Sequence, residues 1–183
     1  GSINVNETFE VASTDSDPAT DGPFAEGSGR TGILISGSSP FEGNVELTST
    51  SSINIEGTDS FGINLTNTSI NQEGLIGDLF TGGAITVRGA RSTAININSG
   101  ITGDFTNTGT INGQGEDIKG INIEADIQGG FVNSAGVSVT GYRSLGRPTI
   151  SESFSSNSRE QITAEDLFQA GSAITIRANI SEG

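Results

Sequence analysis

The stretch "AININSGITGDFTN" at residues 94–107 returns in related form as "GINIEADIQGGFVN" at residues 120–133. The second copy starts 26 residues after the first (120 − 94). Each copy has a small residue, then Ile-Asn-Ile, and each ends on Phe followed two residues later by Asn. Repeats of roughly 20–50 residues are typical of proteins built from stacked equivalent units. The sequence therefore predicts a repetitive architecture.

Looser copies of the motif lie upstream, "GILI" at 32–35 and "GINL" at 62–65, with variable spacing. Dividing the 183 residues by the 26-residue period predicts about seven coils.

A longer echo relates "DLFTGGAITVRG" at 78–89 to "DLFQAGSAITIRA" at 166–178. This echo predicts that Arg88 and Arg177 occupy equivalent places at a corner of the fold.

Apolar and polar residues alternate within the copies, as half-buried strands require. Seven of the eight residues that lie between the paired aliphatic positions are Asn, Thr or Ser, and the eighth is Leu34. Stacked strands lie about 4.8 Å apart, so equivalent side chains fall on top of one another. Like charges would repel in such a row, whereas amides can hydrogen-bond along it. The predicted structural ladder consists of Asn54, Asn64, Asn96 and Asn122.

These patterns predict an all-β protein, a right-handed parallel β-helix (β-solenoid) of about seven coils. We expect an N-terminal acidic cap or loop at 1–30 and coils at 31–140. An inserted loop at 141–162 precedes a further coil at 163–183, with a short helix near 164–169. A β-sandwich is the main alternative, but it has no reason to repeat Gly-Ile-Asn-Ile at a constant interval. Four aromatic residues near the corners are expected to stack inside the core: Phe61, Phe80, Phe105 and Phe131.

Composition excludes several classes of function. The chain has no Cys, which excludes disulfides and thiol chemistry, and no His, which excludes catalysis by a Ser-His pair. Its 22 acidic and 8 basic residues give a formal net charge of −14. Such a field repels phosphate groups, so nucleic acid and anionic membranes are not expected partners.

The repeated motifs "FTNTGTI" at 105–111 and "FVNSAGVSV" at 131–139 resemble the coils of bacterial autotransporter passenger domains. The resemblance covers about residues 31–141 and 166–178. It implies a β-helix displayed on, or released from, the surface of a Gram-negative bacterium, with roles from adhesion and aggregation to hydrolysis. It implies membrane attachment only through a C-terminal barrel domain, which these residues do not include.

The inserted loop is the predicted binding site. It holds Tyr142, the only Tyr, together with Arg143, Arg147 and Arg159, three of the eight basic residues. Loops that project from a repetitive framework carry recognition more often than the framework does. The expected partner is a glycan or protein on a host or neighbouring cell.

The acidic segment near the N-terminus contains a candidate calcium loop. Asp15, Asp17, Asp21 and Glu26 stand at positions 1, 3, 7 and 12 of a twelve-residue stretch. The stretch has no acidic residue at position 5 and no Gly at position 6, and it contains Pro18. A Ca²⁺ site and an ordinary acidic loop both remain open, and no other cofactor is expected.

Three functions are compatible with the sequence. The favoured one is a non-catalytic surface-exposed or secreted module, adhesive or structural, without assigned catalytic residues. The second is a carbohydrate-active enzyme, a polysaccharide lyase or hydrolase, that uses corner carboxylates. The third is a self-associating surface-layer or aggregation module. The carboxylates that the enzyme would need to bring together are Asp78, Asp104, Glu116 and Asp117.

Overall fold

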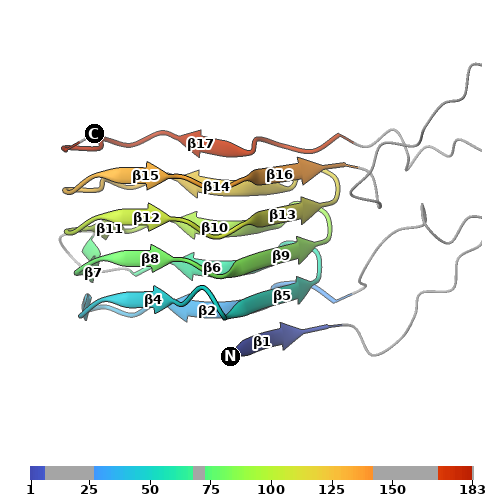
Figure 1. The fold of residues 1–183 in the computed structure, drawn as a ribbon, viewed down its shortest axis with the longest axis horizontal. Helices are drawn as coiled ribbons and strands as arrows, with labels where there is room; N and C mark the ends of the chain where they lie inside the picture. Colours follow the sequence, from blue (N-terminus) through green and yellow to red (C-terminus); the bar gives the residue numbers. More distant parts are fainter. Residues whose placement is uncertain (7–26, 68–72, 142–168, 183) are drawn as a thin grey trace, which may run out of the picture.

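The computed structural model describes residues 1–6, 27–67, 73–141 and 169–182. Seventeen β-strands form these parts, and they contain no helix. All strand pairs are parallel, and the strands wind as a β-solenoid (Figure 1). The predicted all-β parallel solenoid is therefore confirmed, while its right-handed winding stays a prediction.

Four parallel sheets, numbered 1 to 4 here, surround the core. Sheet 1 contains β1 (Ser2–Val5), β5 (Ser52–Glu56), β9 (Ala84–Arg88), β13 (Ile111–Gln114) and β16 (Val137–Thr140). Sheet 2 contains β2 (Thr31–Ile35), β6 (Phe61–Leu65), β10 (Thr93–Ile97), β14 (Lys119–Ile123) and β17 (Ile174–Ile176). Sheet 3 contains β3 (Phe41–Glu42), β7 (Glu73–Ile76) and β11 (Gly100–Ile101). Sheet 4 contains β4 (Val45–Leu47), β8 (Leu79–Thr81), β12 (Phe105–Asn107) and β15 (Phe131–Asn133).

Each turn passes through sheets 1, 2, 3 and 4 in that order, so strands of sheets 4 and 1 run along one side and strands of sheet 2 return on the other (Figure 1). The chain makes about four turns, and the expected seven coils are wrong. Equivalent residues are 26 apart between Thr81 and Asn107, but 32 apart between Ser60 and Ser92. Connections that leave the sheets lengthen the other turns without adding a coil.

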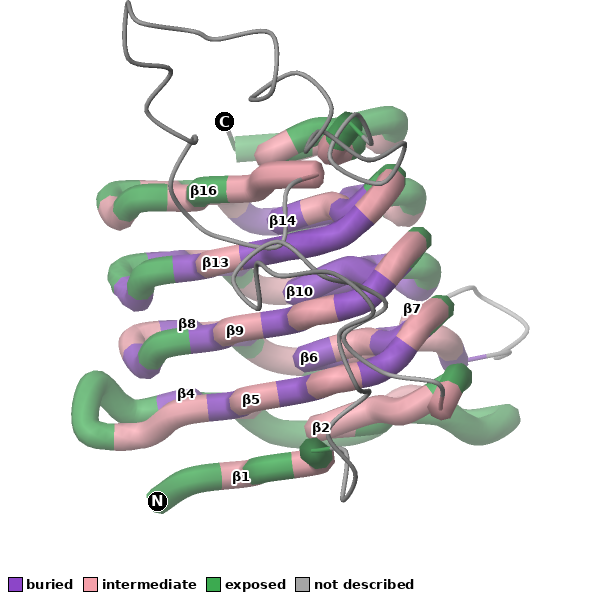
Figure 2. The backbone as a smooth tube through the Cα atoms, turned by 90° about the vertical axis from the view of Figure 1, so that its right-hand side faces the viewer, coloured by how far each residue is buried: buried purple, intermediate pink, exposed green. Residues whose placement is uncertain are grey.

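The core consists of aliphatic columns in exact register from turn to turn. Ile63, Ile95 and Ile121 stack in sheet 2, and each is at most 1% exposed. Ile53 and Ile85 stack opposite them in sheet 1. Along β5 and β9 the residues alternate between buried and more exposed positions (Figure 2). Burial of these columns provides the main driving force for folding.

In each strand of sheet 2, a small residue precedes the Ile-x-Ile or Ile-x-Leu motif and stands where sheets 1 and 2 approach each other. A Cβ atom on Gly62 would lie 2.5 Å from the carbonyl oxygen of Ala94 in the next turn and 2.7 Å from Cγ2 of Ile85 in sheet 1. A larger side chain therefore has no room there. The register gives the column Gly32, Gly62, Ala94, Gly120 and Ala173.

The aromatic residues do not all stack inside. Phe105 is fully buried, and its ring centroid lies 5.0 Å from that of the half-buried Phe131. Leu79, rather than Phe80, is in register with Phe105. Phe80 lies between two buried residues of β8 and so points to the outer face, while Phe61 at the start of β6 is half-buried. The prediction of an inner position is wrong for Phe80, because the inward residues of β8 are its neighbours Leu79 and Thr81.

The echo between 78–89 and 166–178 does not reflect equivalent positions. Arg88 ends β9 in sheet 1, whereas Arg177 follows β17 in sheet 2. β17 stacks on β14, with Ile174 against Ile121. The predicted equivalence of the two Arg residues is therefore wrong.

The N-terminal region predicted as a cap or loop starts with a strand. β1 adds to sheet 1 by pairing with β5, with Ile3 against Ile53. Residues 7–26 and the predicted helix near 164–169, apart from Gln169, lie outside the described residues.

Candidate functional site

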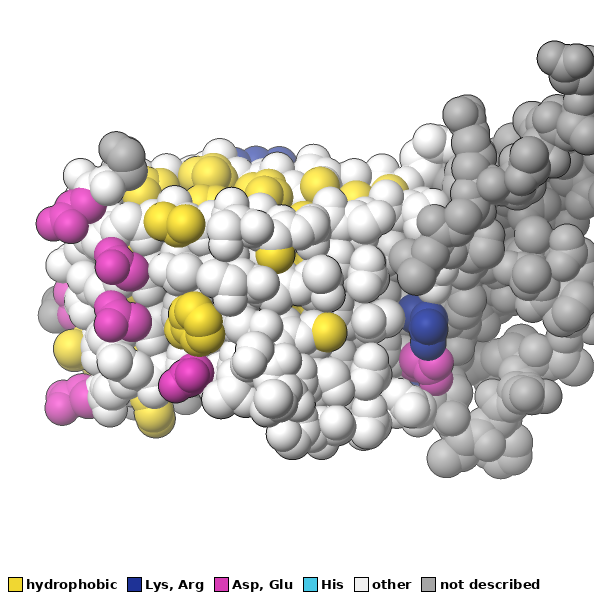
Figure 3. Space-filling model, in the orientation of Figure 1, with side chains coloured by type: hydrophobic (Ala, Val, Ile, Leu, Met, Phe, Trp, Pro, Cys, Tyr) yellow, Lys and Arg dark blue, Asp and Glu magenta, His cyan; other side chains and the backbone are white. Residues whose placement is uncertain are grey.

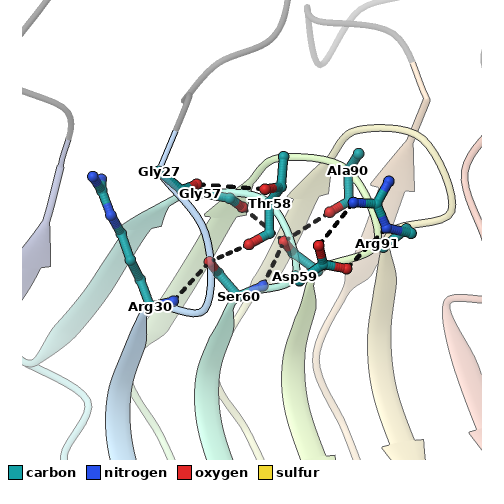
Figure 4. A network of polar contacts seen from close by, with 9 residues as sticks. Gly27, Arg30, Gly57, Thr58, Asp59, Ser60, Ala90 and Arg91 are labelled. Carbon is teal, nitrogen blue, oxygen red and sulfur yellow. Dashed lines mark hydrogen bonds and ion pairs between the residues drawn. The ribbon is translucent and has the colours of Figure 1, made fainter.

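The corner between sheets 1 and 2, called the 1–2 corner below, contains a network of polar contacts (Figure 4). Tight connections at 57–60 and 89–92 join the two sheets in successive turns. The Ser60 hydroxyl accepts a hydrogen bond from the Arg30 N–H at 3.0 Å, and the Ser92 hydroxyl accepts one from the Ser60 N–H at 3.0 Å. Each buried Ser thus satisfies a backbone donor of the preceding turn, which fixes the stacking of the corners.

One non-glycine residue in each of three successive corners adopts a positive φ angle. These residues are Asp59 (φ 50°), Arg91 (φ 56°) and Asp117 (φ 52°). Their N–H groups donate to the turn above, from Asp59 to Ala90 at 2.9 Å and from Arg91 to Glu116 at 2.7 Å. Left-handed backbone is uncommon outside Gly, although Asp tolerates it better than most residues. The hydrogen bonds between turns hold this conformation in place.

Charges of opposite sign alternate along this column. Arg91 donates two hydrogen bonds to the Asp59 carboxylate, at 2.8 and 2.7 Å (Figure 4). The hydrogen bond from Arg91 lowers the pKa of Asp59 below its ordinary value, and Asp59 in turn raises the pKa of Arg91. Glu116 and Asp117 in the next turn add to the rise at Arg91. A second pair on the same side, Arg88 with Glu56, spans 3.3 Å.

Two long connections join the solenoid at this same corner. One lies between β1 and β2, the other between β16 and β17, and both therefore run from sheet 1 to sheet 2. Ser28 bridges to Thr58, and Val5 pairs with Ile55, so Asn6 and Gly27 occupy the places that Glu56 and Gly57 occupy one turn later.

The same comparison holds at the second long connection. The Gly115 N–H donates to Thr140 as the Gly89 N–H donates to Gln114, and the Asp117 N–H donates to Gln169 as the Arg91 N–H donates to Glu116. Gly141 and Gln169 therefore occupy the places that the consecutive residues Gly115 and Glu116 occupy one turn earlier. Segments 7–26 and 142–168 are thus additions to one regular corner.

The predicted binding residues Tyr142, Arg143, Arg147 and Arg159 lie outside the described residues. The predicted calcium ligands Asp15, Asp17, Asp21 and Glu26 also lie outside them. Within the described ranges, no group of three or more acidic side chains is arranged to hold a metal ion.

The expected single row of Asn residues is two rows in two sheets. In sheet 2, Asn96 donates to Asn64 at 2.9 Å, and Asn122 donates to Asn96 at 2.9 Å. Asn54 belongs to sheet 1, where it donates to Asn4 at 2.8 Å. In the part of the chain that the structure describes, Asn122 Oδ1 is a buried side-chain atom without a hydrogen-bond partner.

Sequence reasoning missed a further ladder that faces inward at the corner between sheets 4 and 1. Asn107 is fully buried, accepts a hydrogen bond from the Thr81 hydroxyl at 2.7 Å and donates to Asn133 at 2.7 Å. It also donates to the carbonyl of Gly109 at 3.0 Å, and Asn133 makes the same contact with Ala135. The recurrence of Asn after Phe-Thr and Phe-Val at a spacing of 26 is the signal that could have revealed this ladder.

The corner carboxylates do not converge. Asp78 and Asp104 lie between sheets 3 and 4, whereas Glu116 and Asp117 lie at the 1–2 corner. Asp78 and Asp104 each accept a backbone N–H of the next turn, at 2.9 Å from Asp104 and 2.7 Å from Gly130. These two carboxylates tie turns together, and no catalytic pair forms between the two corners.

The fold defines the chain as a β-solenoid protein. Comparisons with known proteins found no matching family model, no matching curated protein and no matching solved structure. None of the described segments forms a helix that is long and apolar enough to cross a membrane.

Proposed function

We propose that this chain is a non-catalytic β-solenoid module of a surface-exposed or secreted protein, adhesive or structural in role, of the kind found in autotransporter passengers of Gram-negative bacteria. The observation that supports it best is the placement of both long connections, 6–30 and 141–173, at one corner of an otherwise regular stack. Both segments are therefore attached at the same corner of the solenoid, and the paired strands that carry them keep the same register throughout.

The framework is well suited to presentation. Every turn between the two long connections is tied to its neighbours by strand pairing and by the Ser and Asn ladders. The corner charges are paired, as in Asp59 with Arg91, rather than gathered in a cleft. Sequence variation in the two segments would therefore change binding without changing the stack.

The proposed binding residues are Arg143, Arg147, Arg159 and Tyr142, and the proposed partner is a glycan or protein on a host or neighbouring cell. Arg recognises carboxylate and phosphate groups through paired hydrogen bonds, and Tyr packs against sugar rings and apolar surfaces. Three of the eight basic residues of the chain stand in this segment, which also holds Glu152, Glu160, Glu165 and Asp166.

Precise deletions test the proposal. Deleting 7–26 joins Asn6 to Gly27 as Glu56 is joined to Gly57, and deleting 142–168 joins Gly141 to Gln169 as Gly115 is joined to Glu116. We expect both variants to keep the β-sheet circular dichroism spectrum and the cooperative unfolding of the full chain. Binding to a glycan array and to intact cells should fall at least about tenfold for the second variant, about 1.4 kcal/mol.

A triple variant, R143A/R147A/R159A, should show the same loss of binding with unchanged unfolding. Undiminished binding in both the deletion of 142–168 and the triple variant would contradict the role given to segment 142–168. Release of reducing sugar from a polysaccharide panel by the full chain would contradict the non-catalytic role.

A further inference from the structure

The last turn exposes aliphatic side chains that its equivalents bury. Ile174 and Ile176 of β17 are 36% and 47% exposed, whereas Ile121 and Ile123 in the turn below are fully buried. The last turn is held in position by an ion pair of 2.7 Å between Arg177 and Glu124. Hydrophobic side chains follow the upper edge of the molecule, the side on which Figure 1 places β16 and β17 (Figure 3). This end presents an ordered apolar surface.

The opposite end is hollow. A cavity of about 620 Å³ opens beneath the first turn, between β2 and β4, and Ile33, Ile35, Phe41 and Val45 are among its lining residues. Phe41 is 48% exposed and Leu34 is 55% exposed. One end of the protein thus carries protruding aliphatic residues, and the other carries an apolar hollow.

The columns of equivalent residues run through the whole stack, from the first strand of a sheet to its last. Ile33 pairs with Ile63, and the column continues through Ile95 and Ile121 to Ile174. A second copy, shifted along the solenoid axis, would therefore place its Ile33 against Ile174 as Ile174 itself lies against Ile121. In sheet 1 the same shift would place Ile3 against Val137, because both belong to the column of Ile53, Ile85 and Ile111.

Charge does not oppose this arrangement in the columns that would meet. The column of Ile35 and Ile176 places Ser36 next to Arg177. The column that links Phe41 through Leu75, Ile101 and Ile127 to Ile180 places Glu42 next to Ser181. No like charges face each other in these two pairs, which matters for a chain with a formal net charge of −14.

We propose that copies of this chain associate end to end, with the β16–β17 end of one copy on the β1–β2 end of the next. The parallel ladders of sheets 1 and 2 continue across the junction, and Ile174 and Ile176 enter the hollow beside Ile33 and Ile35. Edge strands are ready templates for such pairing. The two surfaces are different, so the contact is heterologous and adds copies in one direction. The association is independent of the binding role proposed above.

Three single substitutions test the junction in sedimentation velocity over a wide concentration range. The unaltered chain should show a sedimentation coefficient that rises with concentration. Ile176→Glu blocks one end and Phe41→Glu the other, and each should raise the apparent dissociation constant at least about tenfold. Thr106→Glu is the control, because Thr106 points to the outer side of sheet 4 from β12, a strand that is paired on both sides and so lies at neither end. It should associate as the unaltered chain does.

Mixing the two blocked variants tests the direction. I176E keeps an intact β2 end and F41E an intact β17 end, so an equimolar mixture should form heterodimers and stop there. Association of either variant alone as strong as that of the unaltered chain, or loss of association in T106E, would overturn the proposal. A concentration-independent monomer for the unaltered chain would overturn it as well.

Cysteine cross-linking gives a second, independent reading, since the chain has no Cys of its own. Asn4 and Ser138 occupy one outward column of sheet 1, so N4C/S138C should form a ladder of disulfide-linked multimers on oxidation. Each single variant should stop at dimers or stay monomeric. The absence of multimers from N4C/S138C would contradict the proposed register.

Discussion

Asp59 and Arg91, 32 residues apart in sequence, lie face to face in adjacent turns and share two hydrogen bonds of 2.8 and 2.7 Å. Both adopt a positive φ angle, and both are about half exposed. The pair therefore joins two corners across the solvent-facing side of the stack. It shows that the 1–2 corner stays stacked although equivalent residues of these two turns are 32 apart in sequence rather than 26.

Asp59→Asn removes the charge while keeping a residue that tolerates left-handed backbone. We expect a small loss of stability in urea unfolding that shrinks at high salt, because exposed pairs are screened. The folded-state pKa of Asp59 lies below its ordinary value of 3.8, so its contribution is present above that value and is lost as pH falls through the lower folded pKa. The difference between variant and parent should therefore vanish at low pH. An equal difference at pH 7 and at pH 2 would contradict this account.

Asn96→Ala should destabilise the protein by about 1–3 kcal/mol, because it removes the hydrogen-bond partner that Asn96 provides to the half-buried Asn64 and to the buried Asn122. Asn96 is 4% exposed and bonds to both neighbours. Asn54→Ala is the matched comparison, since Asn54 contacts only Asn4 in a more exposed place, and it should cost about 0.5–1 kcal/mol. Equal losses in urea unfolding would argue against a cooperative ladder in sheet 2.

Thr175→Asn should stabilise the protein. Thr175 lies in register above Asn122, whose Oδ1 atom is buried without a partner. An Asn there could donate to Asn122 as Asn122 donates to Asn96, a gain of about 0.5–1.5 kcal/mol. Thr175→Val, which offers no donor, is the control. Thermal unfolding should rank the Asn variant above the parent, and an unchanged or lower midpoint would contradict the predicted extension of the ladder.

Gly62→Ala should destabilise by about 1–3 kcal/mol, because the new methyl group would meet the Ala94 carbonyl and Ile85. Gly136→Ala provides the control, since a Cβ there would meet nothing within 4 Å. We expect the control to unfold at the same urea concentration as the parent or slightly above it. If both variants behaved alike, the close approach of sheets 1 and 2 would be wrong.

Much of the fold could be predicted because stacking leaves a direct trace in sequence. Phe105 and Phe131, 26 residues apart, are neighbours in space for the same reason that they are neighbours in the repeat. The number of turns could not be predicted in this way. Segments 7–26 and 142–168 stand in the sequence between neighbouring places of the 1–2 corner, and a simple division by the period counts them as coils.

The side-chain ladders could be predicted only in part. Alternation shows which residues point outward, but not which sheet they belong to, so Asn54 appeared to share a row with Asn64. Asn107 was missed because alternation alone does not show that a buried corner requires a side-chain donor. Asn107 donates to the buried Gly109 carbonyl there. The resemblance between "AITVR" and "AITIR" led to the wrong prediction that Arg88 and Arg177 are equivalent. Strands of sheets 1 and 2 have the same alternation of apolar and polar residues, so the pattern does not show to which sheet a strand belongs.

The most direct test of the central claim, a parallel stack in exact register, is a nuclear Overhauser measurement between methyl groups of selectively labelled Ile. The account predicts contacts of Ile95 with Ile121 and of Ile97 with Ile123, in adjacent turns of sheet 2. Contacts of Ile95 with Ile123 and of Ile97 with Ile121, without the first two, would show antiparallel neighbours and would contradict the solenoid.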